Sequence, residues 1–188
     1  MPNVGWRRAG AGRCGVRVVT RGLVAIFAVA WTLAGCATTT TTHGVPNLRQ
    51  VEGTVWRSGQ PTTPEAWRYL RSLGITTIVK LNRESEGSDA GAVAAGMTVI
   101  PIPMPPSNAW ETLTQPAQSD IRRAVAAMRA GHALVHCTHG QDRTGLAVGA
   151  YRMWVDRWTK SAARREMDAD GFHPELLGLE EAWEALAP

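Results

Sequence analysis

The sequence predicts an α/β layer fold, and two observations lead to this prediction. Short apolar and β-branched runs alternate along the chain with longer segments of helical character, which is typical of helices packed on the faces of a sheet. In addition, the run HALVHC at 132–137 passes into a glycine-bearing loop and then into the mostly apolar segment 144–155. A buried strand, a tight loop and a helix are therefore expected there.

The first expected elements lie between residues 54 and 82. The segment TVWRSG at 54–59 predicts a short strand that enters a turn. Residues 63–74 predict a helix with Thr63 as its N-cap, a proline at the first helical position and Gly74 at its end. The β-branched run ITTIVKLN at 75–82 predicts the next strand.

The second half of the chain continues the alternation. Residues 87–96 predict a short helix and residues 97–104 a strand, before a Pro-rich stretch. From Pro116 to Arg129 apolar residues recur on one face and arginines on the other, so an amphipathic helix is expected. Two more helices are expected at about residues 161–170 and 174–186.

The N-terminal residues have the features of a secretion signal. Five of the 20 Lys and Arg residues precede residue 36, where no Asp or Glu occurs. The apolar core at 23–33 is too short for the roughly 20 residues that a spanning helix needs. Its end, LAGC, resembles the lipobox of bacterial lipoproteins, which implies a signal peptide at 1–35 and lipidation of Cys36. An ordinary signal peptide, or a short anchor with a coincidental cysteine, is the alternative.

Lipidation of Cys36 implies a place in the cell envelope, as a periplasm-facing lipoprotein held to a membrane by its N-terminal lipid. Ala37, in place of an acidic residue, favours the outer membrane. The Thr-rich residues 36–48 are expected to form a tether, and residues 49–188 one catalytic domain. Beyond the signal, 15 Lys and Arg residues remain against 16 Asp and Glu, so no nucleic-acid partner is expected.

Cysteine usage singles out one thiol. The chain has three cysteines, of which Cys14 leaves with the signal and Cys36 receives the lipid. Cys137 is then the one free thiol of the mature chain, and no intramolecular disulfide is expected. Because an unpaired thiol is a liability in an oxidising periplasm, a chemical role is favoured over a place in the core.

The sequence around Cys137, HCTHGQDRTG at 136–145, is typical of an anion-binding loop. Such a loop can turn its backbone N–H groups inward, beside the positive end of the next helix. Arg143 supplies a planar fork for phosphate, these charges favour the Cys137 thiolate, and Thr144 can donate a hydrogen bond to the sulfur. The pattern predicts nucleophilic attack on phosphorus. The expected phosphate-binding positions are Thr138, His139, Gly140, Gln141, Asp142 and Arg143.

The spacing of His136-Cys137, five residues and Arg143-Thr144 resembles the signature of cysteine-dependent protein tyrosine and dual-specificity phosphatases. RSGQP at 57–61 and LGITTIVKLNRE at 73–84 resemble the opening of the atypical dual-specificity branch of bacteria, fungi and plants. The resemblance implies a mixed, largely parallel central sheet flanked by helices. It also implies two-step hydrolysis of a phosphomonoester through a phosphocysteine, without a metal or other cofactor.

The source of the catalytic proton departs from the family pattern. Many of these phosphatases carry an aspartate on an upstream loop, but IPMPPSNAWETLTQP at 102–116 has no Asp and only one carboxylate, Glu111. Asp142 resembles the Asp-Arg pair of myotubularin-like and some bacterial phosphatases. Asp142 is therefore the expected general acid, Glu111 is the alternative, and a purely structural role for Asp142 stays open. His136 is expected to orient the loop, and Arg57 to bond a neighbouring carboxylate.

The substrate expected from this pattern is phosphotyrosine in a protein, or a small phosphomonoester. The loop lacks the lysine that phosphoinositide-directed members often place there, so a phosphoinositide or inositol phosphate is the less favoured alternative. A non-catalytic phosphate-binding module is disfavoured because Cys137, Arg143 and Thr144 occur together. Sulfur- or arsenate-handling enzymes are disfavoured by the length of the loop and the lack of a second redox cysteine.

Overall fold

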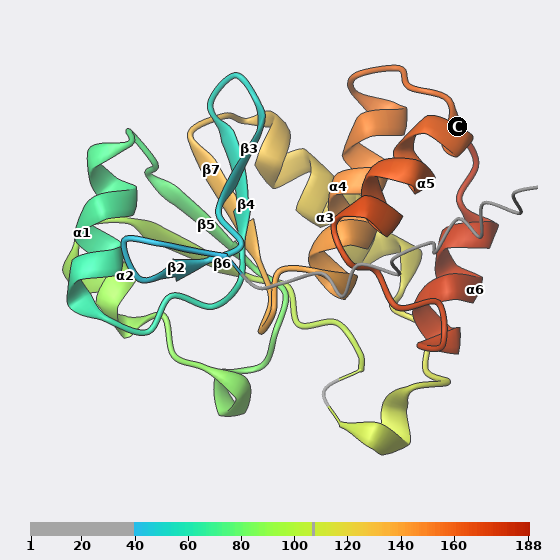
Figure 1. The fold of residues 1–188 in the computed structure, drawn as a ribbon, viewed down its shortest axis with the longest axis horizontal. Helices are drawn as coiled ribbons and strands as arrows, with labels where there is room; N and C mark the ends of the chain where they lie inside the picture. The colour runs from blue at the N-terminus through green and yellow to red at the C-terminus, as the bar shows by residue number, and fades with distance from the viewer. Residues whose placement is uncertain (1–39, 107) are drawn as a thin grey trace, which may run out of the picture. The chain divides into compact units, whose positions relative to one another are not determined.

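A computed structural model describes residues 40–106 and 108–188 (Figure 1). The signal peptide and the lipidated cysteine expected from the sequence lie outside these residues. Within them, the central sheet has five strands in the order β3-β4-β7-β5-β6. Strand β3 pairs antiparallel with β4, and the other pairs are parallel, which confirms the mixed, largely parallel sheet. The strands are β3 (Arg49–Glu52), β4 (Val55–Ser58), β5 (Thr77–Lys80), β6 (Thr98–Pro101) and β7 (Ala133–His136).

Helices cover both faces of this sheet (Figure 1). Side chains alternate between the faces along a strand, so Ile78 of β5 packs in the core beneath the first two helices, and Val79 in the core beneath the other four. Two 3₁₀ turns, η1 (Glu84–Glu86) and η2 (Ala109–Glu111), lie in loops. The helices are α1 (Pro64–Ser72), α2 (Ala90–Ala94), α3 (Gln118–Arg129), α4 (Asp142–Trp154), α5 (Lys160–Ala169) and α6 (Leu177–Ala185).

The helix ends follow the local sequence signals. The side chain of Thr63 accepts a hydrogen bond from the backbone N–H of Ala66 at 3.2 Å, as expected of an N-cap. Gly74, which ends the same segment, has φ +83°, a conformation that glycine adopts at little cost. The predicted N-cap and terminating glycine are confirmed.

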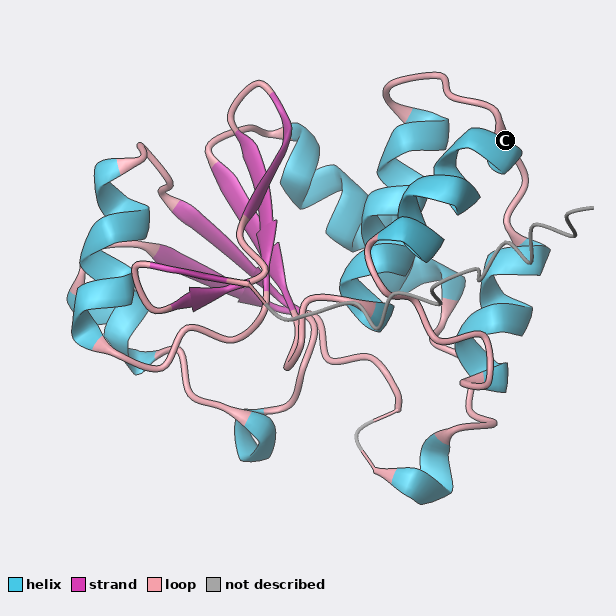
Figure 2. Cartoon of the chain, viewed as in Figure 1, coloured by secondary structure: helices cyan, strands magenta, loops and turns pink. Residues whose placement is uncertain are grey.

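The carboxyl ends of the parallel strands lie together, where the chain leaves the sheet (Figure 2). Ser58 of β4 and Lys80 of β5 both align with His136, the last residue of β7. The loops after these strands are therefore neighbours, and ligands bind at this edge in open α/β sheets. The loop after β7 leads into α4, which begins at Asp142 and is buried along almost its whole length.

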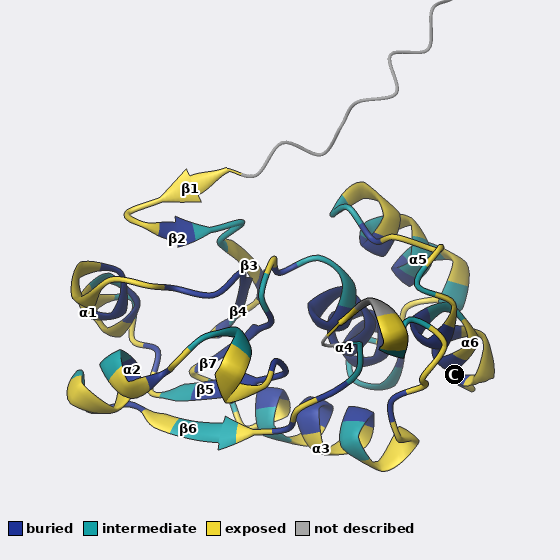
Figure 3. Cartoon of the chain, turned by 90° about the horizontal axis from the view of Figure 1, so that it is seen from below, coloured by how far each residue is buried: buried dark blue, intermediate teal, exposed yellow. Residues whose placement is uncertain are grey.

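The Thr-rich segment is a hairpin where the structure describes it, and its assignment to a tether is wrong there. Strands β1 (Thr41–Thr42) and β2 (Val45–Pro46) pair antiparallel. Val45 has no exposed surface and packs in the same core as α1. Figure 3 shows β1 as exposed and part of β2 as buried. Composition concealed this hairpin because a single apolar side chain anchors it, in a run that is otherwise polar. The folded domain thus begins before residue 49.

Within the described part of the chain, no helix combines the length and the apolar character needed to cross a membrane.

The hairpin predicts a clear stability effect. Val45→Ala should lower the free energy of unfolding by about 1.5–3 kcal/mol, because the valine side chain is fully removed from water. Thr41→Ala, on the exposed strand of the same hairpin, should change it by less than about 0.5 kcal/mol. Chemical unfolding curves measure both. Equal and small effects of the two substitutions would contradict a packed hairpin.

Candidate active site

The loop 137–141 is fixed by hydrogen bonds to its carbonyl oxygens from outside the loop. In a trans peptide unit the carbonyl and the following N–H point in opposite directions, so the N–H groups of residues 139–141 face the inside of the loop. One of them, on Gly140, lies 3.3 Å from the Sγ of Cys137 and donates to it. The three anchoring bonds are Gln60 N to Thr138 O at 3.0 Å, Asn47 Nδ2 to His139 O at 2.9 Å and Arg57 NH2 to Gly140 O at 2.7 Å.

Gly140 allows the loop to approach the turn after β4. Its φ is +77°, and a Cβ added there would lie 2.4 Å from the backbone nitrogen of Gly59. No side chain fits at that distance, so the position requires glycine for both conformation and space. This approach brings Gln60 close enough to hold the carbonyl of Thr138.

Cys137 and Thr144 lie at the two ends of the loop, and both are buried. Cys137 follows the last residue of β7 and is 2% exposed. Thr144, in the first turn of α4, is fully buried, and its hydroxyl has no hydrogen-bond partner among the described residues. The positive end of α4 therefore lies beside the thiol, with a buried hydroxyl in its first turn.

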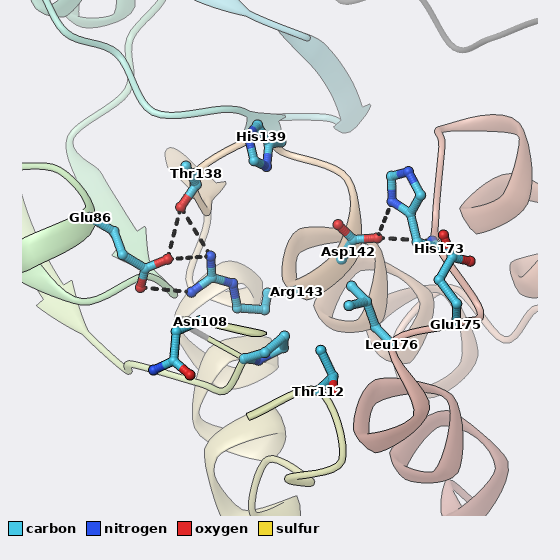
Figure 4. A pocket seen from close by; sticks show the side chains of 11 residues that line it. Glu86, Asn108, Thr112, Thr138, His139, Asp142, Arg143, His173, Glu175 and Leu176 are labelled. Atoms are coloured by element: carbon cyan, nitrogen blue, oxygen red, sulfur yellow. Dashed lines mark hydrogen bonds and ion pairs between the residues drawn. The ribbon is translucent and has the colours of Figure 1, made fainter. Parts of the chain in front are cut away.

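Arg143 is bound on two sides by Glu86 and Thr138 (Figure 4). Its NH2 and NH1 groups donate to the two carboxylate oxygens of Glu86 at 2.7 and 3.0 Å, and NH2 also donates to Thr138 Oγ1 at 3.0 Å. Burial lowers the pKa of Arg143, but Glu86 and the negative charge of Cys137 outweigh it, so the pKa lies above the ordinary value. NH1 also donates to the carbonyl oxygen of Met104 at 3.4 Å, and the guanidinium hydrogen-bonds the Cys137 sulfur.

The sequence analysis missed Glu86. It belongs to η1, in the loop after β5, and also accepts hydrogen bonds from Thr138 Oγ1 at 3.0 Å and from the backbone of Arg83 at 2.8 Å. Burial raises the pKa of Glu86, but the hydrogen bonds from Arg143 and from the Arg83 backbone lower it by more, so the net shift is downward. The only local signal was a pair of glutamates just after a strand, which does not identify the partner.

Arg57 has the structural role that the sequence favoured. Its guanidinium forms a buried ion pair with Asp170, the C-cap of α5, and donates to the carbonyl of Gly140. Burial lowers the pKa of Arg57, although Asp170 acts in the opposite direction. Because Arg57 is 3% exposed and bound at both ends, it joins the loop to α5.

His136 is bound to the carboxylate of Asp89 beside the loop. Its Nε2 lies 2.9 Å from Asp89 Oδ2, and Asp89 Oδ1 accepts from Gln60 Nε2 at 2.8 Å. Burial raises the pKa of Asp89, but the bond to His136 and the other contacts lower it below the ordinary value. His136 is thus connected to the loop through Asp89 and Gln60, because the backbone N–H of Gln60 donates to the carbonyl of Thr138. The orienting role of His136 stays a prediction.

A cavity of about 600 Å³ opens above the loop. Thr138, His139, Asp142 and Arg143 line one part of it, whereas Cys137, Gly140, Gln141 and Thr144 are not among its walls. The other walls come from two segments distant in the sequence. They are Pro106, Asn108 and Thr112 on the Pro-rich stretch, and His173, Glu175 and Leu176 before α6.

The two candidate acids differ in their relation to this cavity. Asp142 lines it, and its Oδ1 accepts hydrogen bonds from the backbone N–H of His173 at 2.9 Å and from His173 Nδ1 at 2.8 Å. Glu111 is not among the lining residues and forms an ion pair with Arg83 at 3.0 Å. The geometry favours the Asp142 side of the cavity as the origin of a proton.

A model of the tyrosine phosphatase family matches residues 39–156. The chain belongs to this family. The sequence resemblance is thereby confirmed, together with the fold that it implied. The match begins at residue 39, which agrees with the hairpin as part of the folded domain.

Individual relatives agree with this assignment. The dual specificity protein phosphatase TpbA of Pseudomonas aeruginosa is 32% identical over 129 residues, which are 69% of this chain and 56% of that protein. The chain thus spans little more than half the length of this relative. Inositol diphosphatase DSP5 of Arabidopsis thaliana is 29% identical over 133 residues, or 64% of this chain and 60% of that protein.

Solved structures of P. aeruginosa TpbA have the same fold. One crystal structure superposes with a TM-score of 0.60 at 27% identity, covering 79% of this chain and 89% of that one. A second, of a TpbA variant in complex with phosphotyrosine, gives a TM-score of 0.57 at 24% identity and covers 81% and 91%.

The lowered pKa of Glu86 predicts a pH-dependent contribution to stability. Glu86→Gln should lower the free energy of unfolding by about 1–2 kcal/mol at neutral pH, because the charged hydrogen bonds to Arg143 become neutral ones. A carboxylate with a lowered folded-state pKa stabilises the fold above its unfolded pKa of about 4.3, and this contribution is lost as pH falls through the folded value. Urea unfolding between about pH 3 and 7 measures the difference.

The control is Glu65→Gln, which removes an exposed pair with Arg68 and should have little effect at any pH. A constant difference between wild type and Glu86→Gln down to pH 3 would contradict the assigned ion pair.

Proposed function

We propose that this protein hydrolyses phosphomonoesters through a phosphocysteine intermediate on Cys137, with phosphotyrosine in a protein as the substrate. The observation that carries the proposal is the orientation of the loop. Its carbonyls are held outward and one of its N–H groups donates to the Cys137 sulfur, so a bound phosphate meets N–H donors that are already in place.

The first step is attack of the Cys137 thiolate on phosphorus, with departure of the alcohol or phenol. The guanidinium of Arg143 binds the phosphoryl oxygens, and Glu86 holds it in position beside the thiol. The loop N–H groups and the end of α4 stabilise the charge that collects on those oxygens. In the second step water releases phosphate, and Thr144 donates its buried hydroxyl to the departing sulfur.

The shape of the cavity favours phosphotyrosine. Cys137 is 2% exposed and is not among the residues that line the cavity, so the phosphoryl group must reach past those residues, which a long aromatic ester does more readily than a short serine or threonine ester. Pro106 and Leu176 offer apolar surface to an aromatic ring. The pTyr complex of the relative TpbA is consistent with this choice.

Inositol phosphates are the second candidate, because one relative is named an inositol diphosphatase. Three carboxylates line the cavity here, on Glu86, Asp142 and Glu175, against the single guanidinium of Arg143. That balance repels a ligand that carries several phosphates. A panel of phosphotyrosine peptides, phosphoserine peptides and inositol phosphates separates the candidates.

Substitution at the loop tests the chemistry. Cys137→Ser should reduce hydrolysis of p-nitrophenyl phosphate on the order of 10⁴-fold or more, because the nucleophile is lost. Arg143→Lys should reduce kcat/KM by roughly 10²- to 10³-fold, because a lysine lacks the planar fork. Arg68→Lys, on the exposed face of α1, is the matched control and should retain full activity. Turnover by Cys137→Ser at the wild-type rate would rule out the proposal.

We also propose that the protein is a lipoprotein of the cell envelope, facing the periplasm. The support is the arginine-rich start, the short apolar core and the cysteine that follows Leu33-Ala34-Gly35. Expression of the full chain should give a product that partitions into detergent and carries fatty acyl groups on Cys36. Cys36→Ser should abolish both properties, and an unmodified N-terminus on the mature wild-type protein would contradict the proposal.

A further inference from the structure

Asp142 and His173 form a pair in which the carboxylate accepts and the histidine donates. Both the backbone N–H and Nδ1 of His173 donate to the same oxygen, Asp142 Oδ1. Figure 4 shows the pair on the side of the cavity away from Glu86. Asp142 also belongs to the first turn of α4, where the helix end favours a negative charge. The side chain of Asp142 is thus engaged as a hydrogen-bond acceptor.

His173 is placed to exchange a proton with a ligand in the cavity. With its Nδ1–H directed to Asp142, the ring has Nε2 left for a second partner. The side chain is 48% exposed and lines the cavity that Arg143 also lines. Imidazole is the side chain whose unperturbed ionisation falls between pH 5 and 8, and a hydrogen-bonded carboxylate fixes which nitrogen is free.

The other titratable groups of the cavity are arranged differently. Glu86 is bound to Arg143, while Glu175 and His139 line the cavity beside the pair. His136 also has a carboxylate partner, but it is fully buried and is not among the lining residues. Among the described residues, His173 alone is a cavity-lining histidine held by a carboxylate of the phosphate-binding segment.

We propose that His173 is the catalytic residue that protonates the leaving oxygen, and that Asp142 is the positioning residue that holds its ring. This inference rests on the proposed function and deepens it. It transfers the role of the acid, which the sequence assigned to Asp142, to the histidine that Asp142 binds.

Both steps of the reaction balance with this assignment. In the first, the Cys137 sulfur bonds to phosphorus as the bond from phosphorus to the leaving oxygen breaks, and Nε2 of the protonated His173 gives that oxygen its proton. In the second, the now neutral Nε2 takes a proton from water while the water oxygen bonds to phosphorus and the sulfur–phosphorus bond breaks. Inorganic phosphate leaves, and the thiolate and the imidazolium are restored.

The test compares substrates whose leaving groups differ in their need for a proton. His173→Gln should slow phenyl phosphate hydrolysis by about 10²-fold or more, but p-nitrophenyl phosphate, whose leaving group is acidic, by less than about 10-fold. With p-nitrophenyl phosphate, His173→Gln should also accumulate the phosphocysteine, seen by intact mass, because the second step has lost its base. Free imidazole should restore part of the phenyl phosphate activity of His173→Gly.

The pH profile and the Asp142 variant separate catalysis from positioning. The loss of wild-type turnover of phenyl phosphate at high pH should be absent from His173→Gln. Asp142→Asn should slow the hydrolysis of phenyl phosphate but keep the loss of turnover at high pH, since the histidine is still present. His43→Gln is the control and should match wild type, because His43 packs on Tyr69 in the hairpin turn and does not line the cavity.

Three results would overturn the inference. The first is that His173→Gln hydrolyses phenyl phosphate and p-nitrophenyl phosphate in the same ratio of rates as wild type, while Asp142→Asn depends steeply on the leaving group. That result would return the role of the acid to Asp142. The same steep dependence in Glu111→Gln would assign it to the Pro-rich stretch. If wild type hydrolyses neither ester, or Cys137→Ser hydrolyses both, the proposed function itself fails, and the inference fails with it.

Discussion

The site depends on the outward anchoring of three consecutive carbonyls in the loop after β7. The donors are Asn47, directly after the hairpin, Arg57 of β4, and Gln60, two residues after the end of β4. Folding therefore supplies the energy that orients the inward N–H dipoles, and no reorganisation remains when an anion binds. This constraint explains why glycine is required at 140 and why the hairpin belongs to the domain.

Two buried arginines touch this loop, and their partners decide their roles. Arg57 donates to Asp170 on one side and to a loop carbonyl on the other, so its charge is fully used in holding the structure. Arg143 is paired through NH1 and NH2 with Glu86 and also hydrogen-bonds the Cys137 sulfur. A buried guanidinium needs a carboxylate to offset its desolvation. Both arginines meet this need, but of the two only Arg143 lines the cavity.

The sequence predicted the parts of the fold that are encoded locally. Thr63 caps its helix through a contact three residues away, and the strand, loop and helix around Cys137 are contiguous. The residues that sequence reasoning missed bind partners that are distant in the sequence. Asn47 binds His139, 92 residues later, and Glu86 binds Arg143, 57 residues later. Local patterns do not report such pairs. Asp142 was identified, but its partner 31 residues later was not.

Of the four buried side-chain polar atoms without a hydrogen-bond partner among the described residues, two belong to residues at the ends of the loop, and the other two are Asn82 Oδ1 and Glu180 Oε2. Among the described residues, the Thr144 hydroxyl and His136 Nδ1 are buried and make no hydrogen bond. Such a group costs about 1–3 kcal/mol, so a fold selected for stability alone would pair or remove it. Thr144 directly follows Arg143, in the turn that faces Cys137. A hydroxyl without a partner there can donate a hydrogen bond to the sulfur when negative charge returns to the thiolate, so that it contributes to departure of the sulfur more than to the resting fold.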